Sequence, residues 1–435
     1  MNAPDVVDVV ALGESMVTFL PTRAGRLADV PSFDRAIGGA ESNVACGLAA
    51  VGHTVRWVSR VGSDGFGDHL VEAVGGYGVD VSAVGRDPSR PTGVYFRTAG
   101  DRATDAHEVA YYRAGSAASA MSVENVDLAS VRAARVLHLS GITAALSEGC
   151  LALLRALMAL GEDRPLVSFD VNHRAGLWRD AEGPRVLLEL ARGADIVFVG
   201  EDEAEEAWGI SGGPSAIRTA LPEPGVLVVK QGAAGATAFV SGAGRWGLVA
   251  PRGGAAYLHS LAPLKSDTGP QIQAAAPSPA PETGGAPQAQ ASDTDPRPQG
   301  AGPAPRPTPP GGGSGSAENG SPSAWAGGTH TRSAPEPGTF VPALHVDVVA
   351  TTGAGDAFAA GFLSATLRGL PLKTRLRHGH LYAAAALTTP GDLATPPTRD
   401  TTDRLAAVAD DAWGTLRLGP GWTQAGTAPE EVRTP

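Results

Sequence analysis

The segment VVATTGAGDAFAAGFLSATLRGLP, residues 348–371, decides how the chain is interpreted. An apolar run breaks at Gly353, and Asp356 follows the glycine turn at once. Apolar residues on a single stripe predict a helix after the turn: Phe358, Phe362, Leu363 and Leu367. Gly369 and Pro371 end that helix, because glycine favours a helix C-terminus and proline prevents continuation. The sequence therefore predicts a glycine turn, an acid in the first helical turn, and a helix that closes at Gly369.

The glycine turn predicts a site for an anion. The amides of a first helical turn have no partners within the helix and carry a partial positive charge. Glycines let a ligand approach this backbone closely, which suits phosphate. Asp356 has two interpretations here, as an ordinary helix-favouring acid or as a general base that takes a proton from an attacking hydroxyl. Phosphoryl transfer needs donors for the moving group and a residue that orients the nucleophile.

The remaining segments predict an α/β fold. Short runs rich in valine, isoleucine and leucine have the character of strands buried on both faces: DVVDVVALG, TVRWVSRVG, RVLHLSG, PLVSFDVN, ADIVFVG and GVLVVKQG. Stretches with helical spacing, such as CLALLRALMAL, separate them. This alternation predicts a doubly wound, mostly parallel sheet sandwiched by helices, with ligands bound beyond the carboxyl ends of the strands.

Two further segments, TGVYFRTAG and HEVAYYRAG, mix aromatic, charged and apolar residues. They predict exposed antiparallel strands, which form either an ordinary edge hairpin or a small β-sheet lid over a site. We place the lid strands near residues 14–37 and 92–115.

The composition limits the function classes. The chain has 435 residues with 43% apolar residues, a net charge of −11 and a sequence pI of about 5.4, so no nucleic-acid footprint is present. Two cysteines imply no disulfide framework, and the start lacks a signal-peptide pattern. No apolar run approaches the ~20 residues that span a membrane. We therefore expect a cytoplasmic protein with no nucleic-acid or membrane partner.

Composition also predicts the domain organisation. About half of the chain's 35 prolines lie between residues 263 and 342, together with the run GGGSGS. Such a segment buries too little apolar surface to offset its ordering entropy. We predict a first part of one domain at 5–251, a disordered insertion at 252–340, the second part at 341–418 and a loose tail at 419–435. A passive insertion is favoured over a docking tail, because loop closure costs grow slowly with length.

Known phosphate-binding motifs do not fit. The chain has no G-x-x-x-x-G-K-[ST], and the dinucleotide pattern G-x-G-x-x-G fails at Phe358. Two other stretches do have a counterpart. TTGAGDAFAAGF resembles the second signature of the ribokinase-like (PfkB) carbohydrate kinases, and GGAESNVACGLAAVG at 38–52, followed by SRVGSDGFGDHL, resembles the first. The resemblance covers nearly the whole chain apart from roughly residues 252–340 and the ends.

Within that family, four pieces are most similar to 2-keto-3-deoxygluconate kinases: GGAESNVA, YYRAGSAAS, LHLSGIT and SFDVNHRAGLW. The resemblance implies phosphorylation of a six-carbon keto-deoxy sugar acid on its terminal hydroxyl, with ATP and Mg²⁺. It also implies a homo-oligomer, because lid strands in this family often pair between subunits. An acidic sugar needs a cation, and Arg113 and Arg174 offer planar forks for a carboxylate.

The resemblance implies a role for each matching residue. Asp356 would be the base, and the amides of Gly353, Ala354 and Gly355 would form the anion hole. The substrate side would comprise Gly38, Gly39, Asn43, Tyr95, Tyr111, Arg113, Arg174 and Asp392. The nucleotide side would comprise Asn172, Lys230, Gly232 and Gly235, with Gly353 and Gly355, and Glu203 would help to order the metal. Plainer interpretations stay open, since an arginine on an edge strand is usually solvated and Asn43 could cap a helix.

Three departures from the family pattern bear on the function. Ala350 stands where the family commonly has an acid, and Gly200 replaces the asparagine of the N-x-x-E motif, although Glu203 remains. The insertion enters just upstream of the strand HVDVVA and the turn. Alternatives therefore remain: another PfkB-type kinase acting on fructose, ribose or a nucleoside, or a sugar-binding pseudokinase.

Overall fold

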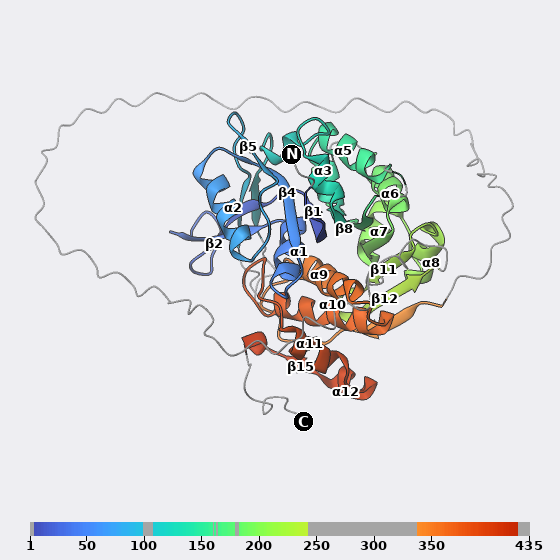
Figure 1. Ribbon diagram of the computed structural model, residues 1–435. Coiled ribbons are helices and arrows are strands. Elements are labelled where there is room, and N and C mark those ends of the chain that lie inside the picture. Colours follow the sequence, from blue (N-terminus) through green and yellow to red (C-terminus); the bar gives the residue numbers. More distant parts are fainter. Residues whose placement is uncertain are drawn as a thin grey trace, which may run out of the picture. The chain divides into compact units, whose positions relative to one another are not determined.

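One nine-stranded sheet organises the chain, in the order β13-β12-β11-β10-β9-β8-β1-β4-β5 (Figure 1). The computed structural model describes residues 4–98, 108–159, 161, 164–178, 182–241 and 337–424. The strands are β1 (Val7–Leu12), β4 (Val55–Gly62), β5 (Val84–Asp87), β8 (Ala134–Ser140), β9 (Leu166–Asp170), β10 (Ile196–Gly200), β11 (Val226–Lys230), β12 (Gly235–Val240) and β13 (Thr339–Pro342). All neighbours pair in parallel except β11 with β12 and β12 with β13.

Helices cover both faces of this sheet (Figure 1). One face packs against α1 (Ala40–Ala49), α2 (Gly65–Gly76), α9 (Ala354–Leu367), α10 (Leu372–Leu387), α11 (Arg399–Ala406) and α12 (Asp410–Thr415). The other face packs against α3 (Leu128–Arg132), α4 (Gly141–Ala145), α5 (Glu148–Met158), α6 (Gly183–Gly193), α7 (Glu201–Trp208) and α8 (Gly213–Ala220).

The strand sequences explain the two apolar layers. Successive side chains of a strand point to opposite faces, so a strand between two helical layers must be apolar throughout. In β10, Ile196 and Phe198 belong to one buried cluster, whereas Val197 and Val199 belong to the other. The predicted fold class is confirmed. Strands β4 and β5 lie on one side of β1, and the later strands from β8 onward lie on its other side. The strand order therefore reverses between β1 and β8, where such folds bind ligands.

A separate four-stranded sheet has the order β3-β2-β6-β7. Its strands are β2 (Met16–Pro21), β3 (Phe33–Gly38), β6 (Val94–Arg97) and β7 (Val109–Tyr112). The pairing of β6 with β7 is antiparallel, as the sequence predicts. The prediction of exposed strands is wrong for β6, because Tyr95 and Arg97 are buried and their polar atoms find partners in a loop far along the chain.

The segment before the glycine turn differs from the predicted strand HVDVVA. Only β14 (His345–Val346) pairs, with β15 (Arg417–Leu418), in a sheet of its own. The amides of Val349 and Ala350 donate instead to the carbonyl oxygen of Leu387 at the end of α10. The backbone therefore leaves the extended conformation before it reaches the turn.

Two predicted boundaries also change. Strand β13 begins at Thr339, inside the stretch predicted as insertion, because Thr339 pairs with Ala238 of β12. Trp422 starts a short 3₁₀ helix and packs against the core, so the first part of the predicted tail is ordered. Residues 242–336 and 425–435, which hold the rest of both predictions, lie outside the described residues. No helix among the described residues has the length and apolar character to cross a membrane.

Candidate active site

The glycine turn begins α9 and requires a glycine at its first position. Gly353 is the N-cap with φ 79°, in the left-handed region. A Cβ at this position would overlap the carbonyl oxygen of Asp392. The first helical bond runs from the amide of Ala357 to Gly353, and the amide of Ala354 bonds weakly to Thr351 at 3.4 Å. In the described backbone the amides of Gly355 and Asp356 have no backbone acceptor, so they are available to an anion.

Asp356 lies beside this turn and is held by α1. The side-chain amide of Asn43 donates to its Oδ2 at 2.9 Å. Asn43 lies within α1, whose N-cap is Gly39, so the helix-cap interpretation of Asn43 is wrong. Removal from water raises the pKa of Asp356 to about 7; Asn43 and Lys230 oppose the rise, while Asp170 and Glu41 add to it. A carboxyl group with this pKa can act as a base near neutral pH.

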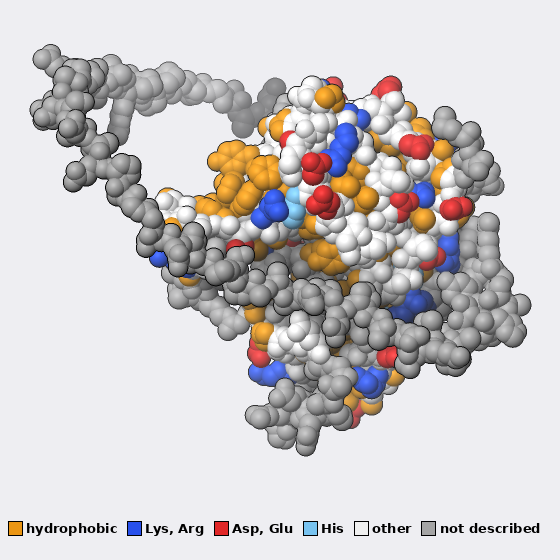
Figure 2. Space-filling view, turned by 60° about the vertical axis from the view of Figure 1, so that its left-hand side comes forward, with side chains coloured by type: hydrophobic (Ala, Val, Ile, Leu, Met, Phe, Trp, Pro, Cys, Tyr) orange, Lys and Arg blue, Asp and Glu red, His pale blue; other side chains and the backbone are white. Residues whose placement is uncertain are grey.

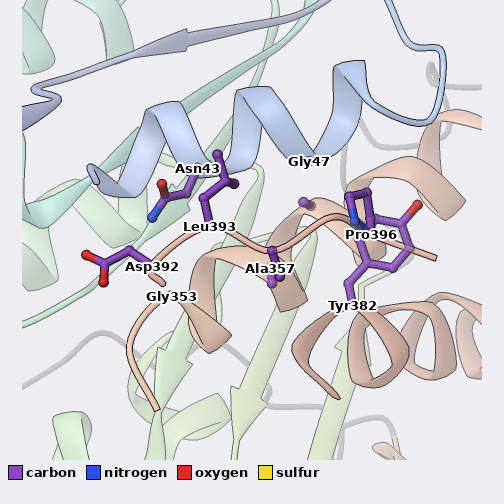
Figure 3. A pocket seen from close by; sticks show the side chains of 10 residues that line it. Asn43, Gly47, Gly353, Ala357, Tyr382, Asp392, Leu393 and Pro396 are labelled. Atoms are coloured by element: carbon purple, nitrogen blue, oxygen red, sulfur yellow. The ribbon is translucent and has the colours of Figure 1, made fainter. Parts of the chain in front are cut away.

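A small pocket opens next to these groups. Figure 3 shows the side chains of Asn43, from α1, and Asp392, from the loop after α10, close to Gly353 at the start of α9. The remaining walls are Gly47, Ala357, Ala360, Tyr382, Leu393, Ala394 and Pro396. The N-termini of α1 and α9 therefore meet at one hollow.

Lys230 brings a positive charge to the turn. It ends β11, and its Nζ donates to both oxygens of Asp170, at the end of β9, at 3.0 and 3.1 Å. Burial by itself lowers the pKa of Lys230, but Asp170, Glu203 and Asp356 together raise it above its ordinary value. A Cβ on Gly355 would lie 3.5 Å from Nζ. The charged ammonium group thus lies within reach of an anion held at the glycine turn.

Three more predicted nucleotide-side residues follow the carboxyl ends of strands. Gly232 and Gly235 have φ angles of 55° and 144°. A Cβ at Gly235 would overlap the carbonyl oxygen of Val341 in β13, whereas Gly232 has open space around it. Asn172, after β9, has φ 41° and is the one non-glycine residue with positive φ in the described chain. Such strained backbone often marks a functional site.

The glycine pair before α1 faces the small sheet. A Cβ at Gly38 would overlap the hydroxyl oxygen of Tyr95, and one at Gly39 would overlap the carbonyl oxygen of Glu14. The Tyr95 hydroxyl donates to Asp392 Oδ2. Tyr111 stacks on Tyr95 with ring centroids 5.5 Å apart, and 54% of it is exposed. The structure therefore brings Gly38, Tyr95 and Asp392 together, with Tyr111 at their outer side.

The two arginines predicted to bind a carboxylate have different surroundings. Arg113 is not a solvated edge residue, because it forms an ion pair with the buried Glu14 and only 11% of its side chain is exposed. Arg174 is 56% exposed, donates to the carbonyl oxygen of His173 at 2.8 Å and lies 3.6 Å from Glu203. Each arginine thus has its own acidic neighbour, and Glu14 already offsets the charge of Arg113.

Glu203 also serves the start of α7. Its Oε2 accepts the amide of Gly200 at 2.7 Å, and its other oxygen faces Arg174. The described residues contain no group of three acidic, histidine or cysteine side chains that would cage a metal ion. Mg²⁺ often binds through one or two carboxylates, water and substrate phosphates, so a single glutamate fits that mode but not an all-protein site.

Four charged residues of this region are absent from the sequence-based prediction: Glu14, Glu41, Arg97 and Asp170. Glu41 is buried in α1, where its Oε1 accepts from Ser140 at 2.7 Å and Thr143 at 2.6 Å, and burial raises its pKa. The signal that indicates Asp170 is an acid at the carboxyl end of an apolar strand. Glu14 and Arg97 carry no such signal, since only the tertiary contacts reveal their partners.

The fold and this site define a ribokinase-like carbohydrate kinase, with a mostly parallel sheet, a small separate sheet and a glycine turn that carries an acid. The chain belongs to the pfkB family of carbohydrate kinases: the family model matches residues 7–252 and 332–399. These two ranges exclude most of the proline-rich segment.

Curated relatives have two kinds of sugar substrate in their names. A 2-dehydro-3-deoxygluconokinase of Thermoproteus tenax is 34% identical over 244 residues, 55% of this chain and 74% of the relative. A 2-dehydro-3-deoxygluconokinase of Bacillus subtilis is 36% identical over 202 residues, 46% of this chain and 62% of the relative. Fructokinase-1 of Zea mays is 36% identical over 205 residues, which again cover 46% of this chain and 62% of the relative. Identity alone therefore does not separate the two sugars.

Solved structures agree on the fold. A PfkB protein from Polaromonas sp. JS666 has 27% identity and a TM-score of 0.62, over 92% of this chain and 100% of that protein. The 2-dehydro-3-deoxygluconokinase of Thermotoga maritima has 20% identity and a TM-score of 0.64, over 94% of this chain and 100% of that protein. An uncharacterized sugar kinase from Pyrococcus horikoshii in complex with ATP has 20% identity and a TM-score of 0.61, over 90% and 96%.

Proposed function

We propose that this protein transfers the γ-phosphoryl group of ATP to a sugar hydroxyl, with 2-keto-3-deoxygluconate as the preferred substrate and its 6-phosphate as the product. One observation carries the proposal. Asp356, with a pKa raised to about 7, lies directly behind a glycine turn whose amides suit a phosphoryl group, and Asn43 fixes its carboxylate. A general base and an anion hole are the two parts that this reaction needs.

In the proposed reaction the sugar hydroxyl oxygen attacks the γ-phosphorus while its proton passes to Asp356. The bond between the γ-phosphorus and the bridging oxygen of ADP breaks, and ADP leaves. The amides at Gly355 and Asp356, with the Lys230 ammonium group nearby, stabilise the charge on the transferred group. The glycine turn after β11, at Gly232, and Asn172 after β9 are assigned to the ATP side.

Mg²⁺ would neutralise phosphate charge during this transfer. Of the described side chains, Glu203 would hold it, and Lys230 and Arg174 lie in the same neighbourhood. Because Glu203 also accepts the Gly200 amide, its replacement should disturb α7 as well as metal binding. A titration of Mg²⁺ at fixed ATP would separate the two effects, since added metal restores activity only where binding is weakened.

Arg113 supports the choice of a sugar acid. It is a largely buried arginine of the lid region, close to Tyr111, with its guanidinium carbon 5.8 Å from the ring centroid. Its guanidinium group has several N–H donors, so it can bind the carboxylate of Glu14 and also offer donors to the carboxylate of a substrate. We assign Gly38, Gly39, Tyr95 and Asp392 to the sugar hydroxyls. Gly38 lies against Tyr95 and Asp392, and Asp392 lines the same pocket as Asn43.

A fructose kinase is the second candidate, and a specific contact favours it. Glu14 pairs with Arg113, so the lid cation is already offset and a neutral sugar meets no unpaired charge there. Fructokinases are also among the relatives at similar identity. Association of copies through the small sheet, where Tyr112 is 66% exposed, is a further part of the proposal.

The deciding experiment measures ATP consumption by the full chain with Mg²⁺ on 2-keto-3-deoxygluconate, fructose, ribose and adenosine at equal concentration. Turnover on the keto-deoxy acid alone would support the proposal. Turnover on another sugar would keep the role of Asp356 and reject the substrate. No turnover on any of the four, with sugar binding still measurable by calorimetry, would favour a pseudokinase.

A further inference from the structure

Arg97 is a buried cation that the proposed reaction does not use. It is the last residue of β6 in the small sheet, and only 2% of its side chain is exposed. A buried arginine is costly unless its charge and its donors are matched. Its partners lie almost 300 residues away, in the loop after α10: Nη2 donates to the carbonyl oxygen of Pro390 at 2.9 Å, and the guanidinium pairs with Asp392 Oδ1.

Asp392 is shared between two residues of the same strand. Tyr95 and Arg97 are two apart in β6, so their side chains lie on the same face of the small sheet. Tyr95 donates to Oδ2 of Asp392, and Arg97 pairs with Oδ1. Only 4% of the Asp392 side chain is exposed. The carboxylate is therefore fixed from one side by both of its oxygens, and its orientation depends on β6.

The loop that contains Asp392 also touches the glycine turn. The carbonyl oxygen of Asp392 packs so closely on Gly353 that a Cβ there would overlap it. Gly353 is the N-cap of α9, three residues before Asp356. A displacement of the loop would thus move the wall of the turn that we assign to the transferred phosphoryl group.

We infer that Arg97 is a positioning residue that ties the small sheet to the loop 388–394 and, through Asp392, to the glycine turn. It does not touch the reacting atoms. It sets the place of a carboxylate assigned to the sugar, so its loss should weaken sugar binding more than it changes the chemical step. The predicted effect on sugar binding rests on the proposed function, whereas the mechanical link does not.

The test compares Arg97→Met and Arg97→Lys with a matched control. Arg97→Lys keeps a positive charge in the buried site, so this variant should fold even if Arg97→Met does not. Its single ammonium group lacks the planar set of N–H donors that arginine offers to Asp392 and Pro390. Arg35→Lys is the control, because Arg35 is an exposed residue of β3 in the same sheet. Hydrogen exchange, read by mass spectrometry, follows residues 350–356 and 388–394 in each full-length variant.

We expect both Arg97 variants to lose amide protection at 388–394 and at 350–356, and the control to keep it. In kinetics, Arg97→Lys should raise the KM for the sugar at least tenfold and lower kcat by a smaller factor, with the KM for ATP changed less than threefold. If Arg97 only stabilised the fold, its replacement would reduce the fraction of active protein. The apparent kcat would then fall, and the KM for the sugar would stay unchanged. Exchange changes confined to β6 and β7, or an unchanged KM for the sugar, would overturn the inference. If the wild type phosphorylates no sugar, the proposed function fails, and the exchange data alone decide the link.

Discussion

The side-chain amide of Asn43 lies 2.9 Å from the Asp356 carboxylate, although 313 residues separate the two in the chain. The contact joins the first helical turns of α1 and α9, which are the two segments that carry the family signatures. A neutral amide donor stabilises the ionised form of an acid without adding a charge of its own. Asn43 thus counteracts the effect of burial on Asp356.

This contact predicts a shift in the pH dependence of activity. Asp356 acts as a base only when ionised, so kcat/KM of the wild type should rise with pH through about 7 and be lost below it. In Asn43→Ala the ionised carboxylate of Asp356 loses its hydrogen-bond donor, so the pKa of Asp356 rises further. The acidic limb of the pH profile of kcat/KM should therefore move up by about one pH unit. Initial rates between pH 5.5 and 9 check this. A limb that stays in place would show that Asn43 does not tune the base.

A second prediction concerns the glycine turn. Gly353→Ala should lower kcat/KM by about 10² or more, because the added Cβ displaces the Asp392 backbone and misplaces the turn. Gly369→Ala is the matched control, since Gly369 has a similar φ of 71° but no heavy atom within 4 Å of the place that a Cβ would take. That control should lose about 1 kcal/mol of stability in urea unfolding and keep its activity. Equal activity losses would mean that backbone strain, not the contact, is responsible.

The sugar-acid assignment predicts an unequal effect of Arg113→Ala. The loss of kcat/KM should be at least tenfold larger for 2-keto-3-deoxygluconate than for fructose, because only the acid presents a carboxylate. Glu14→Gln serves as the companion variant. It removes the charge that offsets Arg113 but can keep the hydrogen bond with Ser116, now 2.6 Å. Equal losses on both sugars would show that Arg113 supports the lid and does not select the substrate.

A fourth prediction concerns the long segment between β12 and β13. Ala238 and Thr339 are direct antiparallel partners, so the segment leaves and rejoins the sheet at one place. Replacement of residues 242–336 by a short Asn-Gly turn should therefore preserve the sheet edge. We expect turnover within about twofold of the wild type and an unchanged far-ultraviolet spectrum per structured residue. Insoluble or inactive protein would give the segment a role in the fold or in a partner contact.

The fold could be predicted from the sequence because its signals are local. Strands such as β10 are apolar on both faces, and the helix after the glycine turn ends at Leu367, two residues before Gly369, as its stripe and stop signals indicate. Strand β14 was harder to predict. Valines at 346, 348 and 349 suggest a strand, but the pairing of Val349 with the end of α10 decides the conformation, and no local pattern reports it.

The residues of the candidate site also fall into two groups, those that local sequence indicates and those that it does not. Asp356, Gly353 and Lys230 follow a turn or a strand end, where local sequence indicates a ligand site. Arg97 and Glu14 lie in the small sheet and its entry, and their partners are fixed by how distant segments pack. On the face of the protein in Figure 2, acidic and basic side chains are interspersed, so the charge of this face does not mark a binding site.

The most direct measurement compares phosphorylation of 2-keto-3-deoxygluconate by the wild type and by Asp356→Asn, with sugar binding to both followed by calorimetry. Our account predicts that the variant binds the sugar within about threefold of the wild type and loses on the order of 10² or more in kcat. A variant that turns over at the wild-type rate would contradict the role of Asp356 as the general base.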